Sequence, residues 1–291
     1  MCGIVGYIGG QSAQNFLVQG LRRLEYRGYD SAGVATITPD GHFALAKAAG
    51  RIDRLHELLV RRPAAGTVGI GHTRWATHGA ATDENAHPHI GGNDLVAIAH
   101  NGVIENYRPL KQALETQGYR FRSATDSVVI AHLLARCLVS EQAAAGSRRD
   151  ADSGELTADQ AMLVRAVRAT LAKLHGTYGL AVLFRQYPGV LIGARLGSPL
   201  VVGVNPHEHF LASDASPLVG YTDQIVYLAD HDVAVLTPDS LHVLDRDSAE
   251  VRPTVQALKL QSTDVDRGGY EHFMLKEIFE QPETLRNTMR G

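Results

Sequence analysis

The chain opens with Met1-Cys2-Gly3-Ile4-Val5-Gly6-Tyr7-Ile8-Gly9. The apolar, β-branched run from residue 4 to residue 8 predicts a buried strand, and the glycines beside it allow neighbouring backbone to approach closely. Removal of Met1 would leave Cys2 with both a thiol and a free α-amine. The amine titrates at about 7.7–8.0 and can accept a proton, while the thiol is a strong nucleophile. Taken alone, Cys2 is more simply explained as a small buried residue at the start of a strand.

The overall composition is that of an ordinary globular protein, with 291 residues of which 44% are hydrophobic and 20% charged. A net charge of -3 gives no reason to expect nucleic acid or an anionic membrane as partner. No apolar run approaches the roughly 20 residues that span a bilayer, and the N-terminus lacks the pattern of a signal peptide. With only Cys2 and Cys137, a reducing cytoplasmic location is expected.

Fourteen histidines raise the question of a metal site. The densest group, His87-Pro88-His89, contains a rigid proline and has no cysteine or helical histidine spacing beside it. We therefore interpret these histidines as structural and expect neither a metal nor a cofactor.

The order of predicted elements favours antiparallel sheets covered by helices over an alternating βαβ fold. Apolar spacing predicts helices over 16–24, from near 106, after 125–127 and from about 159 to 176. Strands are expected at 34–38, 68–71, 95–99, 179–184, 190–194, 200–204, 210–212, 225–228 and 233–236. The polar stretch 141–158 is expected to be a surface loop, and 269–291 to form two short helices broken at Pro282.

A glycine-bounded segment, Gly71-His72-Thr73-Arg74-Trp75-Ala76-Thr77-His78-Gly79, groups several anion-binding side chains and is expected to form a loop. An arginine guanidinium offers a planar fork that matches a carboxylate. Threonine and histidine side chains beside it can complete a cage around an anion. The simpler alternative is a surface turn with a half-buried Trp75.

Asn101-Gly102 follows a predicted strand and could be only a hairpin turn. As a functional pair, the amide of Asn101 and the next backbone N–H are two donors for one oxyanion, and losing one such donor costs about 2.7–4 kcal/mol of barrier. Asp126 stands at a helix start, where capping is the usual role, but it could also accept a substrate ammonium. Together with Cys2 and Arg74, these residues describe a site for an α-amino acid with a side-chain carbonyl.

Longer motifs give a specific resemblance. They are Cys2-Gly3-Ile4-Val5-Gly6, the run 21–33 (LRRLEYRGYDSAG), the segment 71–79, the run 100–106 (HNGVIEN), Thr125-Asp126 and the tail 270–278 (YEHFMLKEI). Over nearly its whole length the chain resembles the glutaminase domains of glutamine–fructose-6-phosphate aminotransferases. These domains are class II glutamine amidotransferases of the N-terminal nucleophile hydrolase superfamily.

The resemblance implies an α+β fold, a four-layer αββα sandwich with two antiparallel sheets between helical layers. It makes Cys2 the nucleophile with its own α-amine as base, and Asn101 and Gly102 the oxyanion hole. The resemblance further assigns substrate binding and gating as follows: Arg74, Thr77 and His78 to the glutamine α-carboxylate, Gly102 and Asp126 to the α-ammonium, Arg27 and Gly28 to the pocket near the nucleophile, and Trp75 to ammonia passage.

The implied reaction is hydrolysis of L-glutamine to glutamate and ammonia. In the full-length enzyme, which is expected to be a homodimer engaged in amino sugar biosynthesis, a further isomerase domain would use the ammonia to convert fructose 6-phosphate to glucosamine 6-phosphate. We expect the glutaminase domain over 2–240, and over 241–291 a last hairpin and a connector toward that domain, which this chain lacks.

Two alternatives remain open at this point. One is the same fold serving another acceptor, as in amidophosphoribosyltransferases. The other is a catalytically silent module that binds an amino acid and regulates a partner, which a retained Met1 would favour.

Overall fold

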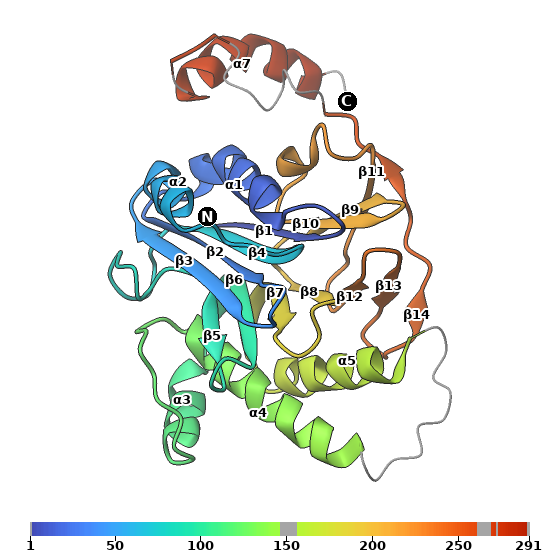
Figure 1. The fold of residues 1–291 in the computed structure, drawn as a ribbon. Coiled ribbons are helices and arrows are strands. Elements are labelled where there is room, and N and C mark those ends of the chain that lie inside the picture. Colours follow the sequence, from blue (N-terminus) through green and yellow to red (C-terminus); the bar gives the residue numbers. More distant parts are fainter. Residues whose placement is uncertain (1, 146–155, 261–268, 272, 290–291) are drawn as a thin grey trace.

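The computed structural model describes residues 2–145, 156–260, 269–271 and 273–289. In this part of the chain, two antiparallel sheets pack face to face between helices (Figure 1). The first sheet has the order β15 (Gln256–Ala257), β11 (Gln224–Tyr227), β9 (Val201–Asn205), β10 (Glu208–Ala212), β1 (Gly3–Ile8), β4 (Val68–Arg74), β2 (Ser31–Ile37) and β3 (Phe43–Ala49). The second has the order β14 (Glu250–Val251), β13 (Leu241–Leu244), β12 (Val233–Leu236), β8 (Leu191–Leu196), β7 (Gly176–Phe184), β6 (Val96–Ile104) and β5 (His89–Gly91).

Helices cover the outer face of each sheet. On the first sheet lie α1 (Ala13–Leu24) and α2 (Ile52–Arg61), and on the second lie α4 (Ser127–Ala145) and α5 (Ala158–Leu171), with α3 (Tyr107–Glu115) packed on α4. Short 3₁₀ turns cover Glu25–Arg27 and Ser216–Leu218, and α7 (Phe273–Met289) lies outside the sandwich in Figure 1. The predicted αββα sandwich is confirmed.

Three apolar layers hold the sandwich together. Side chains of α1, such as Phe16 and Leu21, pack on the first sheet. Between the sheets lie aliphatic side chains that include Ile4 and Ile70. The third layer joins the second sheet to α4 and α5, with Leu133 among its buried residues. Because β1 is a central strand with both faces covered, all six of its residues are buried, which explains its apolar run.

Two strands extend further than the sequence indicated, and both extensions carry candidate site residues. β4 continues to Arg74, since His72, Thr73 and Arg74 are paired with β2 and are buried, so the predicted loop begins only at Trp75. β6 continues to Ile104, with Asn101 opposite Gly179 and Gly102 opposite Tyr178. The hairpin-turn alternative for Asn101-Gly102 was therefore wrong.

Other boundaries also differ from those predicted. Residues 141–145 are helical and belong to α4. Two contacts hold this end of the helix: Glu141 forms an ion pair with Arg165 of α5 at 2.9 Å, and Gln142 donates to Gln186 at 2.9 Å. Residues 146–155 of the predicted loop lie outside the described residues. The C-terminal segment forms one helix, α7, that continues through Pro282. The elements that were not predicted include α2, β3, β5 and the two-residue strand β15.

The hydrophobicity of α4 has a structural explanation. By length and composition alone, the stretch Ser127–Ala144 passes as a possible membrane span, with 56% of it buried inside the protein. Arg136 and Glu141 interrupt it, and the helix packs on β5, β6 and α5. Burial in the third apolar layer accounts for its composition.

The chain beyond residue 240 continues the second sheet before it leaves the sandwich. Val243 of β13 pairs with Ala234 of β12, and β14 adds to the edge of the same sheet. The hairpin that we grouped with the connector thus extends the sheet of the preceding residues, while the boundary itself stays a prediction.

Candidate active site

Cys2 lies directly before the central strand β1, beside the end of β4. Its Sγ accepts a hydrogen bond from the backbone N–H of Trp75 at 3.3 Å and lies 3.6 Å from the Trp75 carbonyl oxygen. The pairing of Gly3 with Thr73 fixes this neighbourhood, because it brings the first residues of β1 alongside the last residues of β4. The thiol is half-buried, so it is held in place and still reachable.

Gly28 packs against the peptide group that joins Arg74 to Trp75. A Cβ at this position would lie 2.6 Å from the carbonyl carbon of Arg74 and 2.8 Å from the nitrogen of Trp75. Since protein Cβ atoms essentially never approach other atoms so closely, only glycine fits here without movement of that peptide. The role of Gly28 in this structure is therefore steric: it lets the peptide that contacts Cys2 sit where it does.

The surroundings of Cys2 have opposing effects on the pKa of its thiol. Burial raises the pKa of the thiol above its ordinary value, because a thiolate is poorly solvated there. The hydrogen bond from the Trp75 N–H and the positive charge of Arg74 act against this increase. A base that removes the thiol proton is accordingly important for reactivity, and a free α-amine on the same residue would be one.

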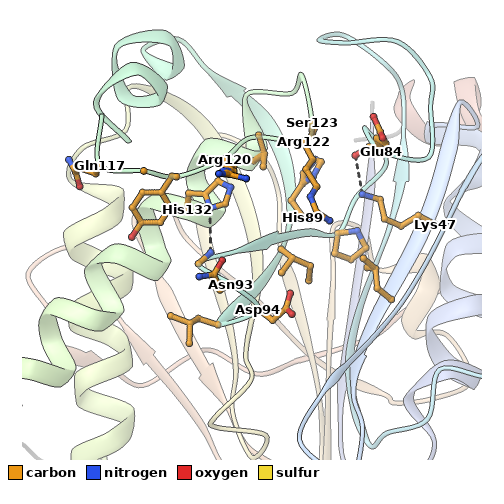
Figure 2. A pocket seen from close by; sticks show the side chains of 18 of the residues that line it. Lys47, Glu84, His89, Asn93, Asp94, Gln117, Arg120, Arg122, Ser123 and His132 are labelled. Atoms are coloured by element: carbon orange, nitrogen blue, oxygen red, sulfur yellow. Dashed lines mark hydrogen bonds between the residues drawn. The ribbon is translucent and has the colours of Figure 1, made fainter. Parts of the chain in front are cut away.

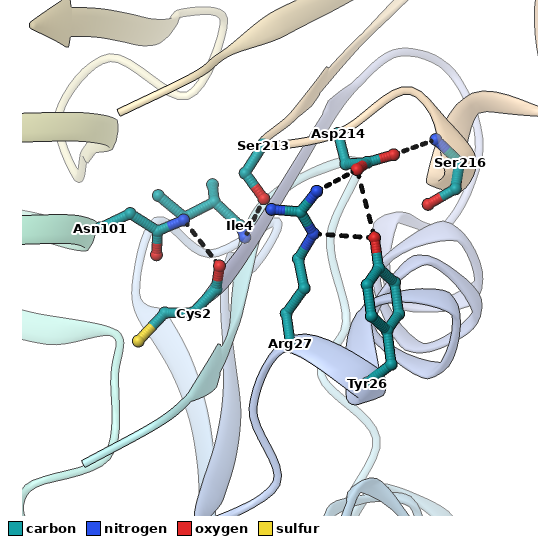
Figure 3. A network of polar contacts seen from close by, with 8 residues as sticks. All are labelled: Cys2, Ile4, Tyr26, Arg27, Asn101, Ser213, Asp214 and Ser216. Atoms are coloured by element: carbon teal, nitrogen blue, oxygen red, sulfur yellow. Dashed lines mark hydrogen bonds and ion pairs between the residues drawn. The ribbon is translucent and has the colours of Figure 1, made fainter. Parts of the chain in front are cut away.

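Asn101 reaches Cys2 from the second sheet. Its Nδ2 donates to the Cys2 carbonyl oxygen at 3.0 Å (Figure 3), and its Oδ1 lies 3.1 Å from Nε2 of His72. The next residue, Gly102, is exposed and has a φ of 135°, in the region that favours glycine. A Cβ there would lie 2.1 Å from the Thr177 carbonyl oxygen, so glycine is required at this point.

Arg74 is almost completely buried, with 4% of its surface exposed. Its guanidinium donates to backbone carbonyl groups of the following loop: those of His78, of Gly79 at 3.1 Å and of Ala80 at 3.1 Å. In this structure the guanidinium therefore holds the far end of the loop next to the end of β4. A carboxylate that binds Arg74 would have to share or replace these carbonyl acceptors.

The loop after β4 carries the other candidate residues. Thr77 is exposed, with its Oγ1 3.3 Å from Nδ1 of His78, and the His78 ring meets Tyr107 edge-on at 6.0 Å. Trp75 is 45% exposed and stands edge-on to Tyr29 at 5.5 Å. Trp75 and Thr77 are thus exposed, and His78 is half-buried.

Asp126 lies just before α4, and its side chain accepts hydrogen bonds from β6 and from the first residue of the helix. Oδ2 accepts the backbone N–H of Ile104 in β6 at 2.8 Å, and Oδ1 accepts from Ser127 Oγ at 3.4 Å. The side chain is buried, with 5% exposed. The carboxylate thus ties the end of β6 to the start of α4, a few residues from Asn101.

Arg27 extends away from the thiol. Its guanidinium pairs with Asp214, and its Nε donates to the Tyr26 hydroxyl at 2.9 Å, as Figure 3 shows. The Ser216 N–H and Arg27 hold the pKa of Asp214 below its usual range in spite of burial. The Arg27 side chain thereby anchors the turn that precedes Gly28.

A group of buried histidines lies next to these residues and was not predicted as part of the site. His72 and His87 stack at 4.1 Å between ring centres, and His87 meets His89 at 4.4 Å. His100 bonds Ser127 at 2.8 Å. In the described part of the chain, no three or more His, Cys, Asp or Glu side chains are arranged to hold a metal ion. His72 is close to Arg74 in the sequence, and His100 precedes Asn101. This proximity could have indicated that the two histidines lie near the site.

A groove of about 1250 Å³ opens beside this region and does not include Cys2. Lys47 and Glu84 lie on one side of it, and Arg120 and His132 on the other (Figure 2). The Lys47 ammonium donates to the Glu84 carbonyl oxygen at 3.1 Å, and burial lowers the Lys47 pKa to about 8. Side chains of both charges line the groove, so its charge favours no single class of ligand.

Comparisons with known proteins identify relatives of the chain. A family model described as "Glutamine amidotransferase domain" matches residues 62–142. The chain is 44% identical over 292 residues to the glutamine–fructose-6-phosphate aminotransferase (isomerizing) of Bacteroides thetaiotaomicron, covering 100% of this chain and 45% of that protein. It is 47% identical over 291 residues to the protein of the same name from Zymomonas mobilis, covering 100% and 44%. The chain thus spans less than half the length of these relatives.

Solved structures give the same fold. The glutamine phosphoribosylpyrophosphate amidotransferase of B. subtilis, complexed with ADP and GMP, matches with a TM-score of 0.66 and 25% identity, over 84% of this chain and 49% of that one. A glutamine aminotransferase class-II domain protein from Silicibacter pomeroyi matches with a TM-score of 0.51 and 15% identity, over 84% and 99%. The latter similarity concerns the fold alone.

Proposed function

The chain carries a class II glutamine amidotransferase domain with the N-terminal nucleophile fold, and from this premise we propose that it hydrolyses L-glutamine through Cys2. The observation that carries the proposal is the meeting of Cys2 with groups from both sheets. The N–H of Trp75, directly after β4 of the first sheet, bonds the thiol at 3.3 Å, and the Asn101 amide of the second sheet bonds the carbonyl of Cys2 at 3.0 Å.

In the proposed reaction, removal of Met1 frees the α-amine of Cys2, which takes the thiol proton. The thiolate attacks the side-chain carbonyl carbon of glutamine, and the oxyanion is held by Asn101 Nδ2 and the Gly102 N–H. The C–N bond then breaks, and ammonia leaves with the proton from the α-ammonium. Water hydrolyses the γ-glutamyl thioester, which releases glutamate and restores the thiol.

The ends of the substrate have natural partners nearby. Arg74, with Thr77 and His78 of the loop, would take the glutamine α-carboxylate in place of the loop carbonyls that it now binds. Asp126 would accept the α-ammonium, together with Gly102. The pocket near the thiol would be bounded by Gly28 and the backbone of Arg27, and the exposed Trp75 would cover the path by which ammonia leaves.

In this proposal the ammonia is used by a further domain of a longer protein. Relatives at 43–47% identity over the whole chain are named glutamine–fructose-6-phosphate aminotransferases, which supports fructose 6-phosphate as the final acceptor through a further domain. In this proposal residues beyond the last hairpin, including α7, form the connector toward that domain, and the full-length enzyme is a cytoplasmic homodimer. A phosphoribosyl acceptor is less well supported, at 25% identity.

The experiment combines intact mass with the alkylating glutamine analogue 6-diazo-5-oxo-L-norleucine. A mass without Met1, one adduct on Cys2 and glutamate release by the same preparation are expected. Cys2→Ala should abolish glutamate release, whereas Cys137→Ser is the matched control, since that thiol is buried in the third apolar layer. Full glutaminase activity in Cys2→Ala would refute the mechanism.

A further inference from the structure

We propose that His72 is a positioning residue that holds the Asn101 amide with its N–H groups turned toward Cys2. This inference rests on the proposed function, in which Asn101 donates to the oxyanion. It goes beyond that function because it assigns a role to a buried histidine of the opposite sheet.

The donor and acceptor roles at this contact are fixed by chemistry. His72 Nε2 lies 3.1 Å from the His100 carbonyl oxygen and 3.1 Å from Asn101 Oδ1. A carbonyl oxygen can only accept, so Nε2 must carry the hydrogen. The amide oxygen of Asn101 is then the atom that faces His72, and its nitrogen must point the other way, toward the Cys2 carbonyl.

The opposite amide orientation would fail at both ends. It would turn the NH₂ group of Asn101 toward the N–H of His72, and its oxygen toward the carbonyl oxygen of Cys2. Two donors would face each other inside the protein, and so would two acceptors. Leaving such buried groups unpaired costs about 1–3 kcal/mol each, so the observed orientation is strongly favoured.

The ring of His72 is itself held in place. His72 lies opposite Ile4 in the strand pairing and therefore faces the second sheet. Its ring stacks on His87 with an angle of 20° between the planes, and His87 Nδ1 accepts the backbone N–H of His100 at 3.2 Å. The imidazole thus spans the two sheets at the level of the nucleophile.

The second nitrogen of His72 shows which form of the ring is present. Nδ1 is buried and has no hydrogen-bond partner among the described residues. Burial also lowers the pKa of His72 to about 3, so the ring is neutral at physiological pH and carries one hydrogen. Because only Nε2 has acceptors, that hydrogen stays on Nε2 and the contact to Asn101 persists.

The consequence for catalysis concerns the second amide hydrogen of Asn101. One hydrogen of Nδ2 goes to the Cys2 carbonyl oxygen, and the other has no acceptor within the described part of the chain. With the amide held by His72, that hydrogen is available to an oxyanion formed beside Cys2. Without His72 the amide can rotate, and the donor is in place for only part of the time.

Two substitutions separate this role from simple packing. In His72→Gln, the side-chain nitrogen can reach the position of Nε2, so the donor to Asn101 is kept. In His72→Asn, the nitrogen reaches only the position of Nδ1, and the donor is lost. Both replacements remove the ring from its stack on His87, so their effects on folding stability should be similar.

We expect His72→Asn to lower kcat for glutamine hydrolysis about 10- to 100-fold with KM changed less than about threefold, because a mainly transition-state contact is weakened. His72→Gln should stay within about fivefold of the unsubstituted kcat. Equal kcat losses in the two variants, with equal melting temperatures, would overturn the proposal. So would a rise in KM without loss of kcat.

A measurement without substrate keeps this test separate from the function. Nitrogen-15 NMR of the His72 ring in the unsubstituted chain should show a neutral ring with its hydrogen on Nε2. A hydrogen on Nδ1 would refute the positioning role whether or not the chain hydrolyses glutamine. A chain without glutaminase activity but with the Nε2 form would refute the proposed function alone.

Discussion

The substitution Gly28→Ala tests how closely the site depends on one peptide group. The added methyl would start 2.6 Å from the Arg74 carbonyl carbon and 2.8 Å from the Trp75 nitrogen. The peptide must therefore retreat by several tenths of an ångström, and the Trp75 N–H that bonds Cys2 Sγ moves with it. A displacement of about 1 Å can cost about a hundredfold in rate, so we expect glutamate release to fall about 10- to 100-fold.

The effect on stability should be smaller than the effect on activity. Overpacking costs about 1–3 kcal/mol. The φ of Gly28 is -176°, which alanine adopts readily, so the loss of unfolded-state entropy returns about 0.4–1 kcal/mol. The free energy of unfolding should fall by roughly 0–2.6 kcal/mol, which lowers Tm by at most a few degrees.

The assay is glutamate release and the rate of Cys2 alkylation, measured beside the thermal unfolding curve. Gly10→Ala is the matched control, because nothing lies within 4 Å of a Cβ at that position. It should retain full activity. If Gly28→Ala folds and hydrolyses glutamine as fast as Gly10→Ala, the argument that this peptide positions the nucleophile is wrong.

Two further predictions concern charge. Asp126→Asn keeps the acceptor for the Ile104 N–H but removes the charge that would meet the substrate ammonium, so KM for glutamine should rise about 10- to 100-fold with kcat less affected; an unchanged KM would contradict the assigned role. Burial lowers the pKa values of three histidines well below the ordinary value, so below about pH 6.5 the unfolded chain binds protons that the folded chain does not. Stability measured by urea unfolding should therefore fall with decreasing pH by about 1.4 kcal/mol per pH unit for each such histidine; a flat profile down to about pH 5 would contradict it. The three are His72, His87 and His89. Burial also lowers the pKa values of His100, His132 and His209, which acts in the same direction.

Antiparallel sheets covered by helices could be predicted because the apolar patterns are local, whereas the four-layer order was implied by the family resemblance. Ile4–Ile8 and the succession of short strands after Tyr178 carry their own period and turn signals. Some errors occurred where tertiary contacts override composition. His72, Thr73 and Arg74 form no apolar pattern, yet pairing with β1 and β2 makes them strand residues. The helix α2 was missed although Ile52, Leu55 and Leu59 follow helical spacing.

The site was predicted as a set of residues but not as a geometry. Sequence motifs gave Cys2, Arg74 and Asn101, which the structure brings together. Nothing in the sequence indicated that the Arg74 guanidinium would bind the carbonyl groups of its own loop, or that the Arg27 side chain would turn to Asp214. The contact of His72 with Asn101 joins residues of different sheets, so no local pattern could reveal it.

The division of the site between two sheets makes activity a late event in folding. Cys2 directly precedes β1 of one sheet, and Asn101 belongs to β6 of the other, so neither layer alone contains the proposed nucleophile with its proposed oxyanion donor. A refolding chain that has formed both sheets but has not yet docked them would have native secondary structure and no turnover. Recovery of glutamate release would then lag behind recovery of the circular dichroism signal. The delay between the two would measure how long the sheets take to pack together.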